Sequence, residues 1–321
     1  MPRRALLLLL LLLLVGGCGR EAARPEGVLR VGHFPNVTHA QGLIAHHRSR
    51  THPGFFEERL DQRIEWYVYN AGPSAMEALL SGSIDLAYVG PNPALNAYVR
   101  TGGDDVRVVS GAAKGGSALV VRRESGIRGA DDLSGRTMAT PQFGNTQDVA
   151  ARSWLSAQGF AVTLTGGDVR VLPTPNAEML ALFQRGEIDA AWTVEPWVSR
   201  LEREARGEIL VEEGDAITTV LVASARIVAS EPELVRRFVQ AHRELTAWIA
   251  EHPEEAKAEV RAELEALTRV PVSPELIDRC WPRLRFTADV SVAAFEEFVG
   301  RARRAGFLQD AGSLDRLVAV P

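Results

Sequence analysis

Apolar residues along this chain follow two spacings that alternate from one segment to the next. Short runs rich in β-branched and aromatic residues predict strands, and longer stretches with apolar residues three or four positions apart predict helices. The expected strands are 28–34, 64–69, 84–89, 106–112, 118–121, 137–139, 169–172, 188–193 and 218–223. The expected helices are 40–48, 73–80, 93–99, 148–157, 177–184, 196–205, 233–250, 254–267 and 292–305. This alternation predicts an α/β protein with largely parallel sheets.

Two segments repeat one pattern at an offset of 104 residues. Met76–Tyr88 and Leu180–Trp192 align without gaps, and each reads as an apolar helix, a glycine that ends it, and a buried strand closing on an aromatic residue. The chain, at 321 residues, is also longer than one hydrophobic core usually fills. We therefore expect two similar lobes around one cleft, because open α/β sheets bind ligands beyond the carboxyl ends of their strands.

The composition is that of an ordinary globular protein. Hydrophobic residues make up 46% and charged residues 24%, which argues against wholesale disorder. Lys and Arg number 36 against 41 Asp and Glu, a net charge of −5, so nucleic acid is not expected as a partner. The 2 cysteines are too few for a disulfide framework or a multi-cysteine metal site, and we expect neither a metal nor a cofactor.

The first residues have the pattern of an export signal. Two arginines precede the unbroken apolar run Leu6–Leu14, which is about half as long as a bilayer span. The stretch Val15–Cys18 resembles the bacterial lipobox, which implies cleavage before Cys18 and a lipid on its sulfur; an ordinary signal peptide is the alternative. We expect a signal peptide over 1–17 and a flexible tether over 18–27, so that the protein works outside the cytoplasm, anchored by its lipid to a bacterial membrane. Loss of 1–17 removes two positive charges and takes the net charge from −5 to −7.

Five segments that follow predicted strands combine glycine, small polar side chains and the start of a helix. They are Phe34–His39, Gly90–Pro93, Lys114–Ser117, Pro141–Gln147 and Glu195–Trp197. A helix N-terminus offers unpaired N–H groups and a partial positive charge, which suit an oxyanion. Aromatic residues at strand ends would enclose an organic tail: Phe34, Tyr88, Phe143, Trp192 and Trp197. The alternatives are helix capping for the polar residues and core packing for the aromatic ones.

These segments resemble the solute-binding lipoproteins of ABC importers for sulfonate, nitrate and taurine. The resemblance is carried by Val31–Ala40, Gly72–Ala78, Asp85–Ala94, Ala139–Val149 and Glu195–Trp197, and it extends over about residues 28–310. It implies a two-lobed α/β architecture, the type II periplasmic binding fold. The implied lobes are 28–117 plus 221–321 and 118–220, joined by hinge strands near Ser117–Val121 and Thr218–Ala223.

The resemblance also implies a function. The protein would be the monomeric solute-binding component of an importer, capturing a small oxyanion-bearing solute such as a sulfonate, taurine or nitrate. It would deliver this solute, chemically unchanged, to a membrane permease that works with a cytoplasmic ATPase. The implied ligand-binding residues are Asn36, Thr38, His39, Pro91, Asn92, Gly116, Ser117, Gly144, Asn145, Thr146, Gln147, Glu195 and Trp197.

Glu195 leaves the charge of the solute open. A carboxylate beside a bound anion is unfavourable, so Glu195 indicates either an amine-bearing solute or an acid held by a local partner. Relatives that bind pyrimidine precursors of thiamine share the motif Glu195–Trp197. Such a pyrimidine is therefore an alternative solute. Five of the 7 histidines lie between His33 and His52, so a metal-binding lipoprotein is a further alternative. No catalytic motif indicates an enzyme.

Overall fold

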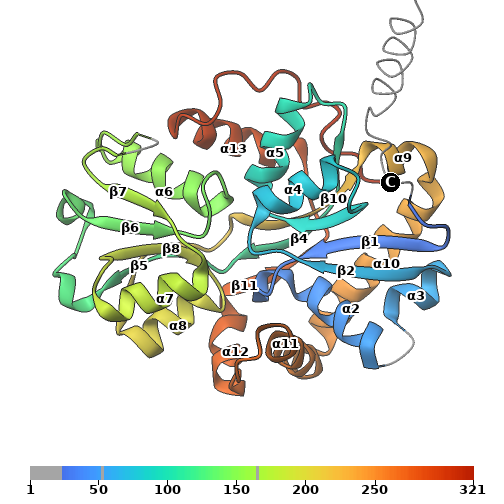
Figure 1. Cartoon of the computed structure of the whole chain (residues 1–321), viewed down its shortest axis with the longest axis horizontal. Helices are drawn as coiled ribbons and strands as arrows, with labels where there is room; N and C mark the ends of the chain where they lie inside the picture. The colour runs from blue at the N-terminus through green and yellow to red at the C-terminus, as the bar shows by residue number, and fades with distance from the viewer. Residues whose placement is uncertain (1–23, 52–53, 164–165) are drawn as a thin grey trace, which may run out of the picture.

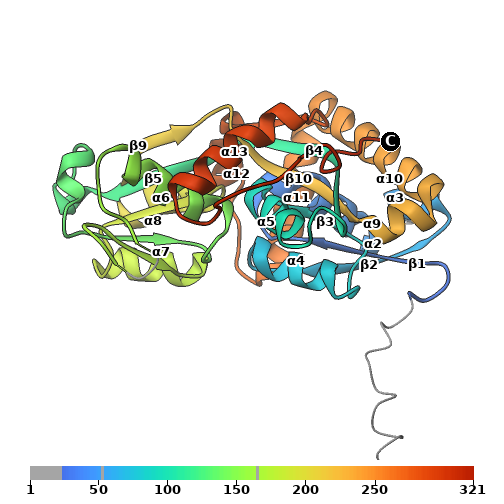
Figure 2. The ribbon, with the colours of Figure 1, turned by 90° about the horizontal axis from the view of Figure 1, so that it is seen from above.

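The computed structural model describes residues 24–51, 54–163 and 166–321. The predicted signal peptide and the predicted lipid attachment at Cys18 lie outside the described residues. Within these ranges, no helix combines the length and the apolar character needed to cross a bilayer. Two sheets lie side by side with helices on both faces of each, which gives the molecule two lobes (Figures 1 and 2).

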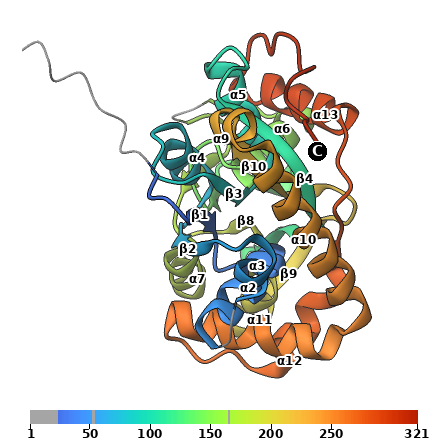
Figure 3. The same ribbon diagram turned by 90° about the vertical axis from the view of Figure 1, so that its right-hand side faces the viewer.

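The larger lobe is built on a six-stranded sheet with the order β11-β4-β10-β3-β1-β2. Its strands are β1 (Val28–His33), β2 (Arg63–Val68), β3 (Leu86–Val89), β4 (Val106–Gly115), β10 (Ile217–Ser224) and β11 (Leu284–Phe286). One apolar core joins it to α2 (Ala40–Thr51), α3 (Phe55–Leu60), α9 (Ala225–Ser230), α10 (Pro232–Glu251), α11 (Pro253–Thr268) and α12 (Pro274–Cys280). A second core, on the opposite face, joins it to α4 (Gly72–Leu80), α5 (Pro91–Arg100) and α13 (Val292–Arg304), as Figure 3 shows.

The smaller lobe is built on a five-stranded sheet with the order β7-β6-β8-β5-β9. Its strands are β5 (Ser117–Arg122), β6 (Thr137–Thr140), β7 (Arg170–Pro173), β8 (Ala190–Val194) and β9 (Gly207–Glu213). One core contains α6 (Thr146–Ala157), and the other contains α7 (Asn176–Arg185) and α8 (Trp197–Ala205).

The repeated sequence pattern occupies equivalent positions in the two lobes. In the larger lobe it forms α4 and β3, and in the smaller lobe it forms α7 and β8. Both strands lie inside their sheets. Strand β3 pairs in parallel with β1, and β8 pairs in parallel with β6. The aromatic residues that close the pattern, Tyr88 and Trp192, are buried in the cores and do not line the cavity described below.

The prediction of largely parallel sheets is wrong, because both sheets are mixed. Among the strands of the described residues, parallel pairing is confined to β1 with β2 and β3, and to β6 with β7 and β8. The antiparallel pairings between these strands all involve β5, β10 or β11. The chain enters β5 directly from β4 and β10 directly from β9, and each of these steps passes from one sheet to the other. Each returning strand then runs against the neighbour that belongs to the parallel set, β8 for β5 and β3 for β10.

The chain crosses between the lobes at Gly116 and again at residues 214–216. The predicted hinge segments lie just beyond these crossings, inside β5 and β10. Gly115 and Gly116 both have positive φ, at 74° and 68°, and a Cβ on Gly115 would lie 2.3 Å from the carbonyl oxygen of Arg283. Glycine is therefore required where the first crossing passes close to the C-terminal part of the chain. The predicted division at 117/118 and 220/221 stays a prediction.

Candidate functional site

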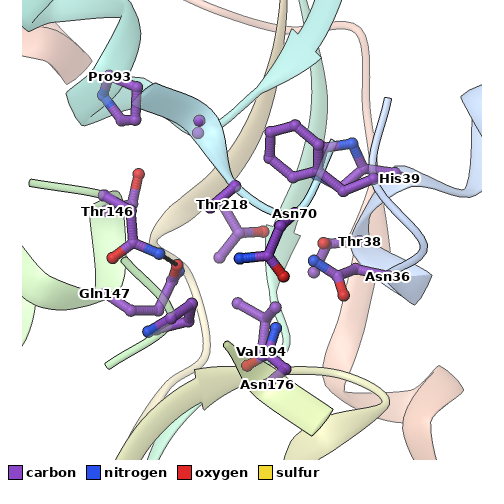
Figure 4. A pocket seen from close by; sticks show the side chains of 16 residues that line it. Asn36, Thr38, His39, Asn70, Pro93, Thr146, Gln147, Asn176, Val194 and Thr218 are labelled. Atoms are coloured by element: carbon purple, nitrogen blue, oxygen red, sulfur yellow. Dashed lines mark hydrogen bonds between the residues drawn. The ribbon is translucent and has the colours of Figure 1, made fainter. Parts of the chain in front are cut away.

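A small cavity of about 20 Å³ lies between the lobes. It is situated where β1, β2 and β3 of one sheet and β6, β7 and β8 of the other reach their carboxyl ends, the usual position for ligands of α/β sheets. The lining residues, shown in Figure 4, are Phe34, Asn36, Thr38, His39, Asn70, Ala71, Gly72, Gly90, Pro93, Pro141, Asn145, Thr146, Gln147, Asn176, Val194 and Thr218.

Five helical segments of the described chain begin at this cavity. They are a short 3₁₀ turn, Val37–His39, that continues into α2, and the helices α4, α5, α6 and α7. The first turn of a helix has N–H groups without intrahelical partners and a partial positive charge of about half an elementary charge. The two lobes together therefore surround the cavity with a positive potential that comes from backbone dipoles.

The lining, as far as the described residues form it, contains no Asp, Glu, Lys or Arg. It does contain the titratable side chain of His39, whose ring lies 4.3 Å from that of Phe34, centroid to centroid. Burial lowers the pKa of His39 to about 3, so the imidazole is neutral at physiological pH. Its Nδ1 is buried without a hydrogen-bond partner among the described residues. The cavity is thus polar but uncharged.

Two asparagines in the lining are fixed through their side-chain oxygens. Trp197 donates its indole N–H to Oδ1 of Asn36 over 3.1 Å, and Thr193 donates its hydroxyl to Oδ1 of Asn176 over 2.7 Å. An amide whose oxygen is already engaged presents its NH₂ group as the remaining polar function. Asn36 and Asn176 therefore act toward the cavity as hydrogen-bond donors, one from each lobe (Figure 4).

The start of α6 is held rigid by its own side chains. The backbone N–H of Asp148 donates to Asn145 Oδ1 over 2.8 Å, and Asn145 Nδ2 donates to Gln147 Oε1 over 3.2 Å. The carboxylate of Asp148 accepts from the Gly144 N–H at 2.9 Å and from Arg152 Nε at 3.1 Å. Asp148 and Arg152 are both buried, and Arg152 neutralises the charge that would otherwise oppose an anion at this helix end.

The lobes touch across the cavity through uncharged groups. The backbone N–H of Asn92 donates to Thr146 Oγ1 over 3.4 Å, and Gln142 Nε2 donates to Ser74 Oγ over 3.2 Å. A Cβ on Gly90 would lie 2.2 Å from Thr146 Oγ1. The absence of a side chain at Gly90 is therefore what allows this approach of the lobes.

Residues 22–265 match the model of the NMT1-like family, which covers most of the chain. The chain belongs to the NMT1-like family. Among curated relatives, the taurine-binding periplasmic protein of Escherichia coli (strain K12) is 25% identical over 191 residues, which is 58% of this chain and 57% of that protein. The chain thus spans less than two thirds of the length of the curated relatives it matches. These relatives are binding proteins rather than enzymes.

Solved structures share the fold of this NMT1-like chain. The alkanesulfonate-binding protein SsuA from Xanthomonas axonopodis pv. citri, bound to MOPS, has a TM-score of 0.74 at 22% identity, covering 94% of this chain and 100% of that one. The periplasmic nitrate-binding protein NrtA from Synechocystis PCC 6803 has a TM-score of 0.75 at 17% identity, covering 91% and 86%. The two-lobed α/β architecture is therefore that of periplasmic binding proteins.

The predicted ligand-binding residues of the NMT1-like chain fall into two groups. One group lines the cavity: Asn36, Thr38, His39, Asn145, Thr146 and Gln147. The other group lies outside the lining: Pro91, Asn92, Gly116, Ser117, Gly144, Glu195 and Trp197. Trp197 donates a hydrogen bond to the lining residue Asn36, and Gly144 donates its backbone N–H to Asp148 in the first turn of α6. Asn92 is buried in the first turn of α5, and both polar atoms of its amide lack a partner among the described residues.

Two of the predicted residues lie at the chain crossing. Gly116 adopts the positive φ described above, and the hydroxyl of Ser117 donates to Glu213 Oε2 over 2.8 Å. The Ser117 hydroxyl also accepts from the indole N–H of Trp192 over 3.2 Å. Both polar functions of Ser117 are thus used within the protein.

Glu195 is fully buried and is not one of the residues that line the cavity. Its carboxylate accepts from Arg283 Nη1 over 2.8 Å, from the Ser199 hydroxyl over 2.9 Å and from the Cys280 thiol over 3.2 Å. Of the two interpretations of this acid, these contacts match the one with a local partner. No amine on the solute is needed to explain Glu195.

Asn70, Asn176 and Thr218 line the cavity but were not predicted. Asn70 follows β2, and Asn176 begins α7 after β7, so the rule applied to the other strand ends would have found both. Thr218 belongs to β10, which returns from the smaller lobe, and the sequence has no local signal for its position.

His46 and His47 lie 3.1 and 3.8 Å from the carboxylate of Glu263, and His52 lies outside the described residues. His33 Nε2 lies 2.9 Å from His46 Nδ1, whereas His39 lies in the cavity lining. The part of the chain that the structure describes holds no group of three or more His, Cys, Asp or Glu side chains placed to bind a metal.

Proposed function

We propose that this protein is the extracytoplasmic solute-binding component of an ABC importer and that its solute bears an oxyanion group. The observation that carries the proposal is the convergence of five helix N-termini on a cavity whose described lining has no charged side chain. Hydrogen-bond donors on both lobes face this space, and oxyanions bind readily at helix N-termini. Taurine, alkanesulfonate and nitrate binding by the relatives and by proteins of the same fold supports the same class of solute.

The mechanism follows from the position of the donors. An anion that contacts Asn36 on the larger lobe and Asn176 on the smaller lobe binds the closed form better than the open form, so it favours closure. The closed form docks on the permease, where opening releases the unchanged solute. Because the chain is net acidic, long-range attraction does not capture the anion, and local dipoles supply the affinity.

Thermal unfolding of the purified protein tests the class of solute. A ligand bound only by the native state stabilises it by about 2.7 kcal/mol at 100 times its Kd. We expect a higher Tm with one or more of taurine, methanesulfonate, nitrate, bicarbonate and methylphosphonate, and no change with tetramethylammonium. Stabilisation by a hydroxymethylpyrimidine alone would move the solute to the alternative class. Stabilisation by zinc alone would contradict the proposal.

We also propose that Cys18 is lipidated, that residues 1–17 are removed, and that the protein works as a monomer at the membrane surface. The sequence Val15–Cys18 supports the lipid. In the Cys18→Ser variant we expect the protein to leave the membrane fraction, whereas Cys280→Ser, at the other cysteine, should stay membrane-bound. Equal membrane association of both variants would contradict lipidation, and a dimer mass in solution would contradict the monomer.

A further inference from the structure

The C-terminal part of the larger lobe reaches back to the smaller lobe at two places. Helix α12 contacts α8, and helix α13 contacts α6. In Figure 1 these two contacts lie on opposite sides of the strands that cross between the lobes, and Figure 2 shows α13 extending over the boundary. Between the two helices, β11 pairs with β4 beside Gly115, where the first crossing begins.

The first contact is centred on Arg283. Its Nη1 lies 2.8 Å from Oε1 of Glu195 and 2.9 Å from Oε2 of Glu202, both in the smaller lobe. Arg279 adds a second bond to Glu202, at 3.0 Å. Glu195 is fully buried, so its pairing with Arg283 is shielded from solvent.

The second contact is centred on Arg301, which forms a largely buried ion pair with Glu213 at the end of β9. One turn further along α13, Arg304 Nε donates to Ser153 Oγ of α6 over 3.1 Å. The small residues Ala302 and Ala305 pack against Val149 of the same helix.

Both contacts act on elements that form the cavity or the crossings. Glu213, held by Arg301, also accepts from the Ser117 hydroxyl, so one carboxylate joins α13 to the start of β5. Helix α6, against which α13 packs, presents its first turn to the cavity. Glu195 lies two residues before Trp197, which orients Asn36.

We propose that the segment Pro274–Leu308 is a clasp that holds the two lobes closed by itself, before any solute contributes. The clasp raises the population of the closed form, and a closed form that is already populated binds its solute with a higher apparent affinity. The inference rests on the proposed function only in taking the closed form as the solute-binding form.

The test measures closure without solute, by small-angle X-ray scattering of the purified protein. In the variant with both Arg301→Gln and Arg304→Gln, we expect the closed-to-open ratio to fall about tenfold or more, since hydrogen bonds to charged groups are lost, and the radius of gyration to rise. Glu213→Gln removes the ion pair from the other lobe and should open the protein in the same way. Adding Arg301→Gln to Glu213→Gln should then have little further effect.

Arg303→Gln is the matched control. Arg303 lies in the same helix but pairs with Asp310 at an exposed position, and its replacement should leave the radius of gyration unchanged. A radius of gyration equal to the unmodified protein's in both the double variant and Glu213→Gln would overturn the clasp. Equal opening by Arg303→Gln would overturn it as well. Because no solute is added, failure of the proposed function leaves this result intact.

Discussion

The two lobes meet at a cleft and at a clasp, and the two regions are built from different chemistry. Across the cleft the contacts are neutral hydrogen bonds, such as those of Asn92 with Thr146 and of Gln142 with Ser74. At the clasp they are arginine–carboxylate pairs, such as Arg283 with Glu195. Neutral contacts are easily exchanged for contacts with a solute, whereas charged pairs with little exposure are costly to break.

Arginines also neutralise two acidic side chains near the cavity, so that these do not repel a bound anion. Glu195 directly follows Val194 of the cavity lining, but its carboxylate pairs with Arg283 and is not part of the lining. Asp148, under the first turn of α6, is neutralised by Arg152 in the same way. Both of these acidic groups thus pair with an arginine, and the helix N-termini determine the potential that a solute meets.

The largest effect is expected at the cleft from Gly90→Val. A Cβ at this position would lie 2.2 Å from Thr146 Oγ1 on the other lobe, so the closed form cannot form without displacing α6. We expect the affinity for the best solute of the thermal screen to fall by about 100-fold or more, as measured by calorimetry. The free energy of unfolding should fall by no more than the free energy that favours the closed form over the open form, because the lobes can separate to relieve the clash.

Gly129→Val is the control for this change. A Cβ on Gly129 would have no atom of the described residues within 4 Å, and Gly129 lies away from the cavity, so this variant should bind normally. Normal binding by Gly90→Val would show that the solute does not need the closed arrangement of Gly90 and Thr146.

Much of the cleft was predictable because it is local in sequence. The segment Asn145–Gln147 lies between a predicted strand and a predicted helix, which is where parallel sheets place their ligands. The helix–glycine–strand repeat likewise predicted two lobes, since α4–β3 and α7–β8 are the same unit in each sheet.

The clasp was not predictable from the same pattern. The apolar spacing of 292–305 predicts α13 but does not say that Ala302 and Ala305 face the other lobe rather than solvent or core. Arg283 and its partner Glu195 are 88 residues apart, and no local rule pairs them. Contacts between distant segments depend on the assembled fold, and this also explains why the place of Thr218 was missed.

A smaller effect is expected from Asn176→Asp, which exchanges a donor for an acceptor at constant shape. Thr193 can still donate to the carboxylate, but the NH₂ group facing the cavity is replaced by a negatively charged oxygen. We expect oxyanion affinity to fall about 10- to 100-fold in calorimetry, the range for a lost hydrogen bond to a charged group. Gln158→Glu adds the same charge at an exposed position of the smaller lobe and should bind normally. Unchanged affinity in Asn176→Asp would place the anion elsewhere.

The smallest effect concerns pH and His39, the titratable side chain in the lining of the cleft. Burial lowers the pKa of His39 to about 3, against about 6.5 in an unfolded chain. Between these values the unfolded chain binds a proton that the folded chain does not, so the free energy of unfolding falls as the pH drops below 6.5, by about 2 kcal/mol at pH 5 for this group. In urea unfolding, His39→Gln should therefore lose about 2 kcal/mol less than the unmodified protein between pH 7.5 and pH 5. His46 and His242 are present in both proteins, so the difference reports His39 together with its electrostatic effect on the pKa of His33. Because the cleft stays uncharged over this range, oxyanion affinity should also be nearly independent of pH. An affinity that rises as the pH falls through 6.5 would mean that His39 becomes cationic in the cleft, and the contrast between a neutral cleft and a charged clasp would then fail.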